Sequence, residues 1–292
     1  MQASSKRGPL LALIASSVLW GLIWLPLKWF GQSGINSLAL LMVAYGALSV
    51  VCLPLLYRSS LIWRSHTGVM LLVFVMGGYA NIAFNTSMMY GDVVRCMVLF
   101  YTLPVWSLLG GYVFLKEPIT AWRACAAVLA ITGAWLILGG MKAFETAPGW
   151  MDILALSSGF AYAMNNLCFR ASPHIPVAPK IATMFLSACL FSIVLLFVGL
   201  DQLPHDLPLS IWGMAAAFGL VWILFANMGT QWGVTHIEAG RAAIIIVLEL
   251  VVAVITATIW GDAHLLPVEW TGAALILIAA FMEVRDEGGE RA

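Results

Sequence analysis

The stretch that decides the fold is RCMVLFYTLPVWSLLGGYVFLKEP, residues 95–118. It begins with an arginine, continues through about twenty mostly apolar residues interrupted by one proline, and ends abruptly in lysine, glutamate and proline. A segment that is apolar on every side cannot fold as a water-soluble helix, because such a helix needs one polar, solvent-exposed face. The stretch therefore predicts a membrane span that starts at a charged residue.

The same pattern occurs a second time along the chain. A shift of 146 positions places Arg95 on Arg241 and Asp92 on Glu238, and it places the apolar run 96–115 on 242–261. We interpret this as an internal repeat in which each copy contributes one charged start and one apolar span.

Composition sets the class of protein. Apolar residues make up 62% of the 292 residues and charged residues only 10%, so a soluble chain of this length could not hide its apolar surface. The five cysteines are scattered through apolar runs without a CxxC pair, and we interpret them as small buried hydrophobes. We expect no cofactor, no metal site and no nucleic-acid partner for this polytopic membrane protein.

Ten apolar runs of about twenty residues match the thickness of a hydrocarbon core. The first follows Lys6 and Arg7 and is too long for a signal peptide, so we expect it to remain as a span. The connectors are too short to hold a soluble domain. The runs cover approximately 10–30, 36–57, 67–89, 93–115, 120–139, 150–170, 177–199, 210–234, 240–261 and 267–285.

Positive residues predict the orientation. With ten spans and the N-terminus inside, three cations (Lys28, Arg95 and Lys142) fall at outer ends, and the other eleven fall on the inner side. This asymmetry predicts that both termini are cytoplasmic. The inner cations are Lys6, Arg7, Arg58, Arg64, Lys116, Arg123, Arg170, Lys180, Arg241, Arg285 and Arg291.

The repeat predicts the architecture. Five spans per copy is an odd number, so the second copy enters the membrane from the opposite side. The predicted fold is an all-α polytopic membrane protein of ten transmembrane helices, arranged as two inverted five-helix repeats with both termini inside. Residues 1–146 form the first repeat and residues 147–292 the second. Proteins of this kind bind substrate near the midplane, where the halves meet.

Four short motifs along the chain are Trp20-Gly21, Leu103-Pro104-Val105, Lys116-Glu117-Pro118 and Leu248-Glu249. Together with the ten spans in two copies, they resemble the EamA family of the drug/metabolite transporter superfamily. Within that family the chain as a whole is most similar to the YddG-type exporters of aromatic amino acids. It departs from the family pattern in two places, since Leu250 stands where proline is common and Gly261-Asp262 replaces a second glutamate turn.

Amide side chains inside the spans are the first candidates for a substrate site. Asn81 and Asn85 lie four residues apart and share a helix face, and their repeat partners Asn227 and Gln231 have the same spacing. An amide both donates and accepts hydrogen bonds, so these two ladders could bind a zwitterion. The alternative is that they only form hydrogen bonds between helices.

Mid-span aromatic residues are the second group of candidates. Trp20, Trp24 and Trp222 lie too deep for an interfacial belt, and a buried indole needs a partner for its N–H group. Aligning the first span with the sixth places Trp24 on Asn165, next to Asn166. An apolar wall facing an amide wall would suit an amino acid with a large side chain, although these tryptophans could also simply pack against helices or lipid.

Glu249 is the carboxylate deepest within a span, and two interpretations remain open. It could carry a proton or pair with an ammonium group, because intramembrane acids are costly and usually functional. It could instead make a structural or gating bond, which we favour because no second acid or histidine offers a relay. Three tyrosines that could supply cavity hydroxyls, or could cap a carbonyl, are Tyr79, Tyr101 and Tyr162.

Several function classes are excluded or disfavoured by the residues. Polyanionic substrates would need cations near the midplane, and the cations here lie at span ends. A membrane-embedded enzyme is the alternative from another class, but the sequence has no H-E-x-x-H motif, paired intramembrane aspartates or serine with histidine. A TVGYG-type channel filter is also missing. We expect an inner-membrane exporter of aromatic or other hydrophobic amino acids, or a broad-specificity metabolite exporter, acting as a monomer or weak homodimer.

Overall fold

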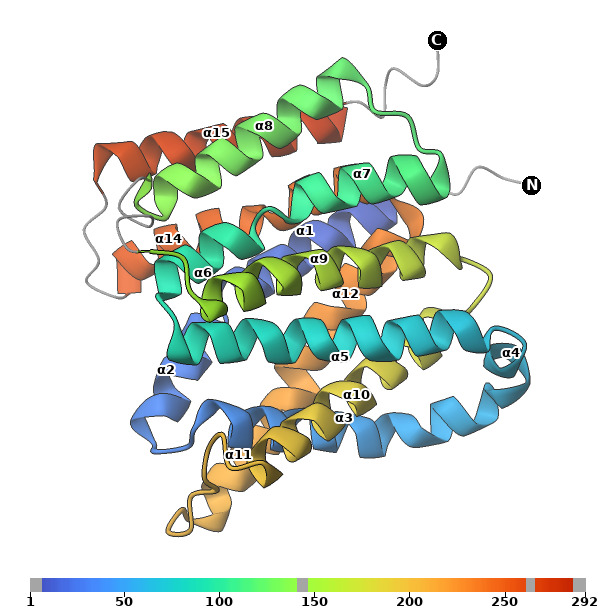
Figure 1. Cartoon of the computed structure of the whole chain (residues 1–292), viewed down its shortest axis with the longest axis vertical. Coiled ribbons are helices and arrows are strands. Elements are labelled where there is room, and N and C mark those ends of the chain that lie inside the picture. Colours follow the sequence, from blue (N-terminus) through green and yellow to red (C-terminus); the bar gives the residue numbers. More distant parts are fainter. Residues whose placement is uncertain (1–6, 141–146, 261–265, 286–292) are drawn as a thin grey trace.

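A computed structural model describes residues 7–140, 147–260 and 266–285, which are α-helical and contain no β-strand (Figure 1). The helices are α1 (Arg7–Gly21), α2 (Trp24–Gln32), α3 (Ser37–Arg58), α4 (Ser60–Arg64), α5 (Thr67–Tyr90), α6 (Val93–Phe100), α7 (Leu103–Leu115), α8 (Ala121–Ile137), α9 (Trp150–Ala171), α10 (Val177–Phe197), α11 (Leu209–Phe218), the π-helical η2 (Gly219–Ile223), α12 (Leu224–His236), α13 (Ala239–Ile246), α14 (Leu248–Trp260) and α15 (Pro267–Arg285).

Successive helices combine into long rods. When α1 is joined to α2, α6 to α7, α11 to α12 through η2, and α13 to α14, the described residues form ten rods besides the short α4. Eight of these are long and apolar enough to cross a membrane. The other two are α8, an apolar helix of 17 residues, and α9.

The helices pack in a pattern that repeats between the two halves of the chain. Helix α5 packs against α9 as its counterpart α12 packs against α1, and α7 packs against α9 as α14 packs against α1. In Figure 1, the rod that contains α12 crosses obliquely behind α5. The described helices thus have a two-repeat architecture.

Two proline residues account for two of the breaks within rods. Proline cannot donate to the carbonyl four residues earlier and clashes with it, and Pro26 and Pro104 stand four residues after Leu22 and Phe100. The helices are interrupted at Leu22–Ile23 and at Tyr101–Thr102. The corresponding break in the second half lies at Val247, 146 positions after Tyr101, although Leu250 replaces the proline there.

The break at Val247 coincides with a close crossing of helices. A Cβ atom added at Gly21 would lie 2.6 Å from the Glu249 carbonyl oxygen, so α1 approaches the α14 backbone as closely as only glycine allows. The break at Val247, which has no proline, therefore lies where another helix packs closely against the backbone.

Helices α8 and α15 lie side by side (Figure 1) and cross at two glycines. A Cβ atom at Gly133 would lie 2.6 Å from the Gly272 carbonyl oxygen, and one at Gly272 would lie 2.5 Å from the Gly133 carbonyl oxygen. Small residues allow such close packing in membranes, where apolar burial alone does not drive helices together.

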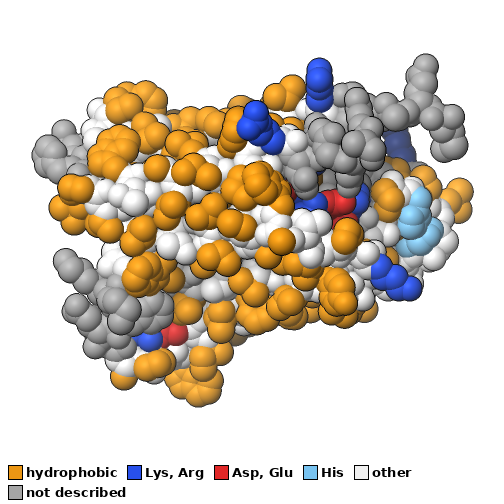
Figure 2. All heavy atoms as spheres, turned by 90° about the horizontal axis from the view of Figure 1, so that it is seen from above, with side chains coloured by type: hydrophobic (Ala, Val, Ile, Leu, Met, Phe, Trp, Pro, Cys, Tyr) orange, Lys and Arg blue, Asp and Glu red, His pale blue; other side chains and the backbone are white. Residues whose placement is uncertain are grey.

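On the face that Figure 2 shows, hydrophobic side chains cover most of the described surface, and the charged side chains lie in a few small groups. We call the end with α4 and the α7–α8 connection the α4 end, and the opposite one the α2 end. Three cations that the sequence places at the α4 end, Arg123, Lys180 and Arg241, are buried rather than exposed. All five cysteines are free, but Cys125 is exposed and Cys168 partly exposed, so the expectation of burial is wrong for Cys125.

Candidate functional site

A cluster of amides and a tyrosine lies in the centre of the bundle, where α3, α5, α9 and α12 meet. The Tyr45 hydroxyl donates to Asn81 Oδ1 at 2.8 Å. From the other half, Asn165 Nδ2 and Gln231 Nε2 donate to Asn166 Oδ1 at 3.4 and 3.5 Å. These five residues form what we call the central amide cluster.

The two parts of the cluster are adjacent. Asn81 Nδ2 donates to the Gly77 carbonyl at 2.9 Å, and a Cβ atom added at Gly77 would lie 2.9 Å from Asn165 Oδ1. The absence of a side chain at Gly77 thus lets the Asn165 amide approach the backbone of α5. One half of the chain supplies Tyr45 and Asn81, and the other supplies the remaining amides.

Two oxygens of the cluster accept no hydrogen bond from any described residue. They are Asn165 Oδ1 and Gln231 Oε1, and both side chains belong to residues with 0% exposure. Buried polar atoms in proteins rarely lack partners, because desolvation without a hydrogen bond is costly. The two oxygens are therefore candidate acceptors for a donor carried by a ligand.

Tyr101 and Glu249 join the two broken rods. The Tyr101 hydroxyl donates to Glu249 Oε1 at 2.7 Å, and Tyr101 lies at the α6–α7 break while Glu249 follows the α13–α14 break. Phe100 packs against Tyr101 and Tyr162, with ring centroids 5.5 and 5.7 Å apart. These predicted site residues therefore come together as an aromatic and acidic group between the halves.

Each candidate tryptophan links the first rod to a helix of the second half. Trp20 Nε1 donates to Thr230 Oγ1 at 3.2 Å, and Trp24 Nε1 donates to Thr256 Oγ1 at 3.1 Å. Trp222 lies in the π-helical segment and donates to the Leu19 carbonyl at 3.1 Å. Trp20 also packs against the buried hydrophobic core to which Tyr45 of the central amide cluster belongs.

Of the four amides in the two expected ladders, Asn81 and Gln231 are the ones with a hydrogen bond to a side chain of another described helix. Asn85 Nδ2 donates to the Asn81 carbonyl and Asn227 Nδ2 to the Ile223 carbonyl, so both satisfy the backbone of their own helix. Tyr79 is 37% exposed and forms a hydrogen bond with Ser157 Oγ. The structure therefore places Asn85, Asn227 and Tyr79 outside the central amide cluster.

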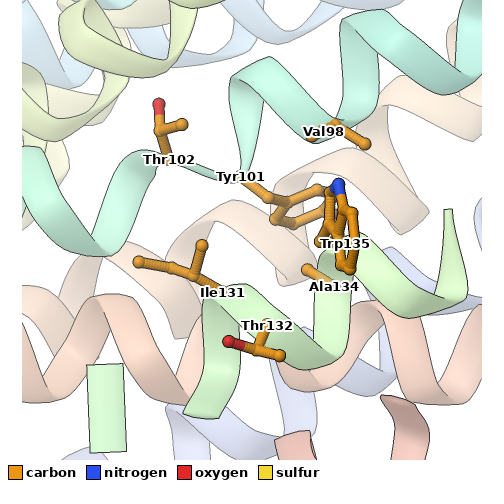
Figure 3. Close-up of a pocket in the computed structure, with 7 residues that line it drawn as sticks. All are labelled: Val98, Tyr101, Thr102, Ile131, Thr132, Ala134 and Trp135. Carbon is orange, nitrogen blue, oxygen red and sulfur yellow. The ribbon is translucent and has the colours of Figure 1, made fainter. Parts of the chain in front are cut away.

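A cavity of about 390 Å³ lies between the α6–α7 break and α8 (Figure 3). Tyr101 and Trp135 lie together between these elements, and the cavity is also lined by Val98, Thr102, Ile131, Thr132 and Ala134. Because the Tyr101 hydroxyl bonds Glu249, this side chain separates the cavity from the acid.

Ion pairs join the halves at both ends of the bundle. At the α4 end, Glu117 accepts from Arg170 Nε and from the Ala239 N–H, each at 2.8 Å. Arg123 pairs with Glu238 beside it. At the α2 end, Arg95 Nε lies 3.0 Å from Asp152 Oδ1. We call these the α4-end clamp and the α2-end clamp.

The two-repeat arrangement of the helices agrees with a comparison of the sequence with known protein families. The profile of the EamA-like transporter family matches residues 7–139 and again residues 149–285. The chain belongs to the EamA-like transporter family. It is thus a multi-pass membrane protein of the drug/metabolite transporter superfamily, a superfamily of transporters rather than enzymes.

Solved structures support the fold of this EamA-like transporter. One, described only as a crystal structure of a protein, has a TM-score of 0.73 with 16% identity and covers 94% of this chain and 98% of its own. At that identity the likeness concerns the fold alone. A search of curated proteins gives no match.

Some contributors to the site of this EamA-like transporter were not predicted from sequence. Tyr45 lies in a long apolar run, and only its mid-span hydroxyl could have drawn attention to it. Thr230 could not be recognised from the sequence, because a threonine in a helix usually donates to the backbone of its own helix. Thr230 also does so here. The partners of Glu117 lie 53 and 122 residues away in sequence, so the glutamate turn alone could not reveal a clamp.

Proposed function

We propose that the chain exports aromatic and other hydrophobic amino acids from the bacterial cytoplasm, as its resemblance to YddG-type exporters implies. The observation that carries the proposal is the pair of buried acceptor oxygens, Asn165 Oδ1 and Gln231 Oε1. An ammonium group carries three donors and fits a site of neutral oxygens that already lack partners. Amides bind a zwitterion without adding charge of their own to the membrane interior.

Aromatic side chains near these oxygens fit the other part of such a substrate. Tyr45 packs against Phe185 with ring centroids 5.7 Å apart, and Phe100 packs against Phe84 at 4.6 Å. Offset and edge-on ring contacts stabilise an aromatic ligand beyond the area that it buries. The described cations lie at the ends of the rods, so a phosphorylated substrate has no counter-charge at the centre.

Alternating access is the mechanism that the architecture suits. In our proposal all ten rods cross the membrane as two inverted repeats, residues 1–146 and 147–292, with both termini and the α4 end in the cytoplasm. Substrate enters when the α4-end clamp opens and leaves when the α2-end clamp opens. The halves rock about the central amide cluster, where inverted-repeat transporters bind substrate.

Uptake into proteoliposomes tests the substrate class. Labelled phenylalanine should enter faster than labelled threonine in the same preparation, and a run with and without a pH gradient separates proton-coupled from downhill transport. Equal, low rates for both amino acids together with extrusion of a cationic dye would instead support the broad-specificity exporter of the same family.

A variant of Gln231 connects the flux to the site. Gln231→Leu keeps the size of the side chain but removes one of the two free acceptors, and losing a hydrogen bond to a charged group costs about 1.5–3 kcal/mol. Phenylalanine affinity should therefore fall about tenfold or more. Asn227→Leu is the matched control on the same helix, since this amide bonds its own backbone.

A further inference from the structure

A second cavity lies at the α4 end and shares no lining residue with the central amide cluster. It has a volume of about 480 Å³ and runs between α3, α5 and α10, with α4 at its mouth. Leu56, Trp63, Leu71, Phe74 and Leu186 line it, so its walls are almost entirely apolar. We call it the α3–α5–α10 groove.

The groove opens to the surroundings of the bundle. Leu71 is 63% exposed although it lies in the second turn of a membrane-spanning helix. A Cβ atom added at Gly68, another lining residue, would meet no atom within 4 Å. A groove with this position and lining faces the acyl chains of the bilayer and has room for one of them.

Two cations flank the mouth of the groove. Arg58 ends α3 two residues after Leu56, and the Arg64 guanidinium lies 5.8 Å from the ring of Trp63. No Asp or Glu occurs between residues 37 and 91 or between 153 and 200, which together hold every element that forms the groove. The elements that form the groove thus carry cations at its mouth and no acid of their own, which favours an anionic headgroup near a membrane surface.

Histidines add further donors at the same end of the bundle. His66 directly precedes α5, and His174 follows α9, with ring centroids 4.6 Å apart. Their ring nitrogens can donate to phosphate oxygens when they carry hydrogen. The two imidazoles come from different halves of the chain, so a headgroup held here would contact both halves.

We propose that the α3–α5–α10 groove is a binding site for one anionic phospholipid. One acyl chain lies along Leu71 and Phe74, and the phosphate lies between Arg58 and Arg64. The site is separate from the transport pathway proposed above, so it does not depend on the identity of the transported substrate.

Native mass spectrometry of the full chain in detergent tests the site. After incubation with equal amounts of phosphatidylglycerol and phosphatidylcholine with identical acyl chains, the wild type should retain phosphatidylglycerol several-fold more often. Arg58→Gln/Arg64→Gln should lose this preference. Arg285→Gln is the matched control, since it removes a cation at the same end that lies over Phe281 instead.

A second variant tests the groove itself, not only its charge. Gly68→Phe fills the cavity at a position that tolerates a side chain, so it should reduce retention of both lipids while the fold survives. Glycerol phosphate without acyl chains should not compete with phosphatidylglycerol. Equal retention of both lipids by the wild type, an unchanged preference in the double arginine variant, or full competition by glycerol phosphate would each overturn the proposal.

Discussion

Lys180 shows how a single buried side chain supports this fold. Its ammonium group has 0% exposure and donates to the carbonyls of Phe169 and Ser172 at 3.1 and 2.9 Å, and it lies 4.8 Å from the Phe169 ring centroid. These carbonyls belong to the last turn of α9 and the residue after it, where helices leave acceptors unsatisfied. Lys180 thus caps α9 from the neighbouring helix.

Replacing this lysine should destabilise the protein. Lys180→Met keeps the length of the side chain but leaves two or more buried acceptors without a donor, which costs about 2 kcal/mol or more. The apparent unfolding temperature in detergent should fall by about 5 °C, since 1 kcal/mol corresponds to about 2–4 °C in a chain of this size. The exposed Lys28→Met should leave it unchanged, and equal melting of the two variants would show that the cap does not stabilise α9.

Glu249 offers a sharper test at the residue scale, because the structure gives it a defined partner. Tyr101 donates to its carboxylate, and Glu249→Gln preserves an oxygen that can accept the same hydrogen bond. If the residue is structural, as we favour, the glutamine form should transport at nearly the wild-type rate. Glu249→Ala should impair all transport by leaving the Tyr101 hydroxyl without its acceptor.

Comparing two modes of transport decides between the roles of Glu249. A residue that carries a proton is needed for gradient-driven flux but not for exchange of labelled for unlabelled substrate. Loss of gradient-driven flux with exchange intact in Glu249→Gln would prove the structural interpretation wrong.

At the scale of elements, the clamps should control which end of the bundle is open. Glu117→Gln weakens the contacts of the α7–α8 connection with Arg170 and Ala239, and Asp152→Asn weakens the pair with Arg95 at the other end. A ligand-free equilibrium between two states shifts towards the state whose closing contacts are retained. The first variant should favour opening at the α4 end and the second opening at the α2 end.

Spin-label distances measure these opposite shifts. Labels at the exposed positions Ser65 and Pro173 report on the α4 end, and labels at the exposed positions Gln32 and Leu209 report on the α2 end. The α4-end distance should lengthen in Glu117→Gln and not in Asp152→Asn, with the reverse at the other end. Identical distance distributions in both variants would mean that the clamps hold loops without gating.

Helix positions were largely predictable from sequence, because apolar run length directly reflects membrane thickness. The expected spans at 67–89 and 267–285 correspond to α5 at Thr67–Tyr90 and α15 at Pro267–Arg285. The breaks were harder to predict, since the one at Val247 has no proline and coincides with the approach of Gly21 to the Glu249 backbone. Such packing between residues far apart in sequence leaves no local pattern.

The sequence predicted which types of residue form the candidate site better than it predicted which of these residues bond to one another. Asn165, Asn166 and Gln231 bond to one another, as polar residues buried inside spans tend to do, and Asn81 lies next to them through Gly77. Helical spacing alone also suggested Asn85 and Asn227, which, like Asn81, donate to the backbone carbonyl one turn earlier but have no hydrogen bond to a side chain of another described helix. Spacing identifies a shared face but cannot tell which amide finds a partner on another helix.

At the scale of the whole molecule, orientation is a prediction that cysteine labelling can check. In a cysteine-free background, needed because Cys125 is exposed, a cysteine at Ser59 should be shielded from an impermeant thiol reagent in intact cells. One at Thr146, outside the described residues, or at Gln32 should react. The opposite pattern would contradict both the cytoplasmic termini and the assignment of the α4 end.

The central claim is that the central amide cluster binds the ammonium group of an amino acid during export. Its most direct test is competition against labelled phenylalanine flux in proteoliposomes by unlabelled phenylalanine and by 3-phenylpropionate, which has the same ring and carboxylate but no ammonium group. Unlabelled phenylalanine should compete fully and 3-phenylpropionate at least about tenfold more weakly, the factor expected when an acceptor loses a charged donor. Equal competition by the two compounds would contradict the claim.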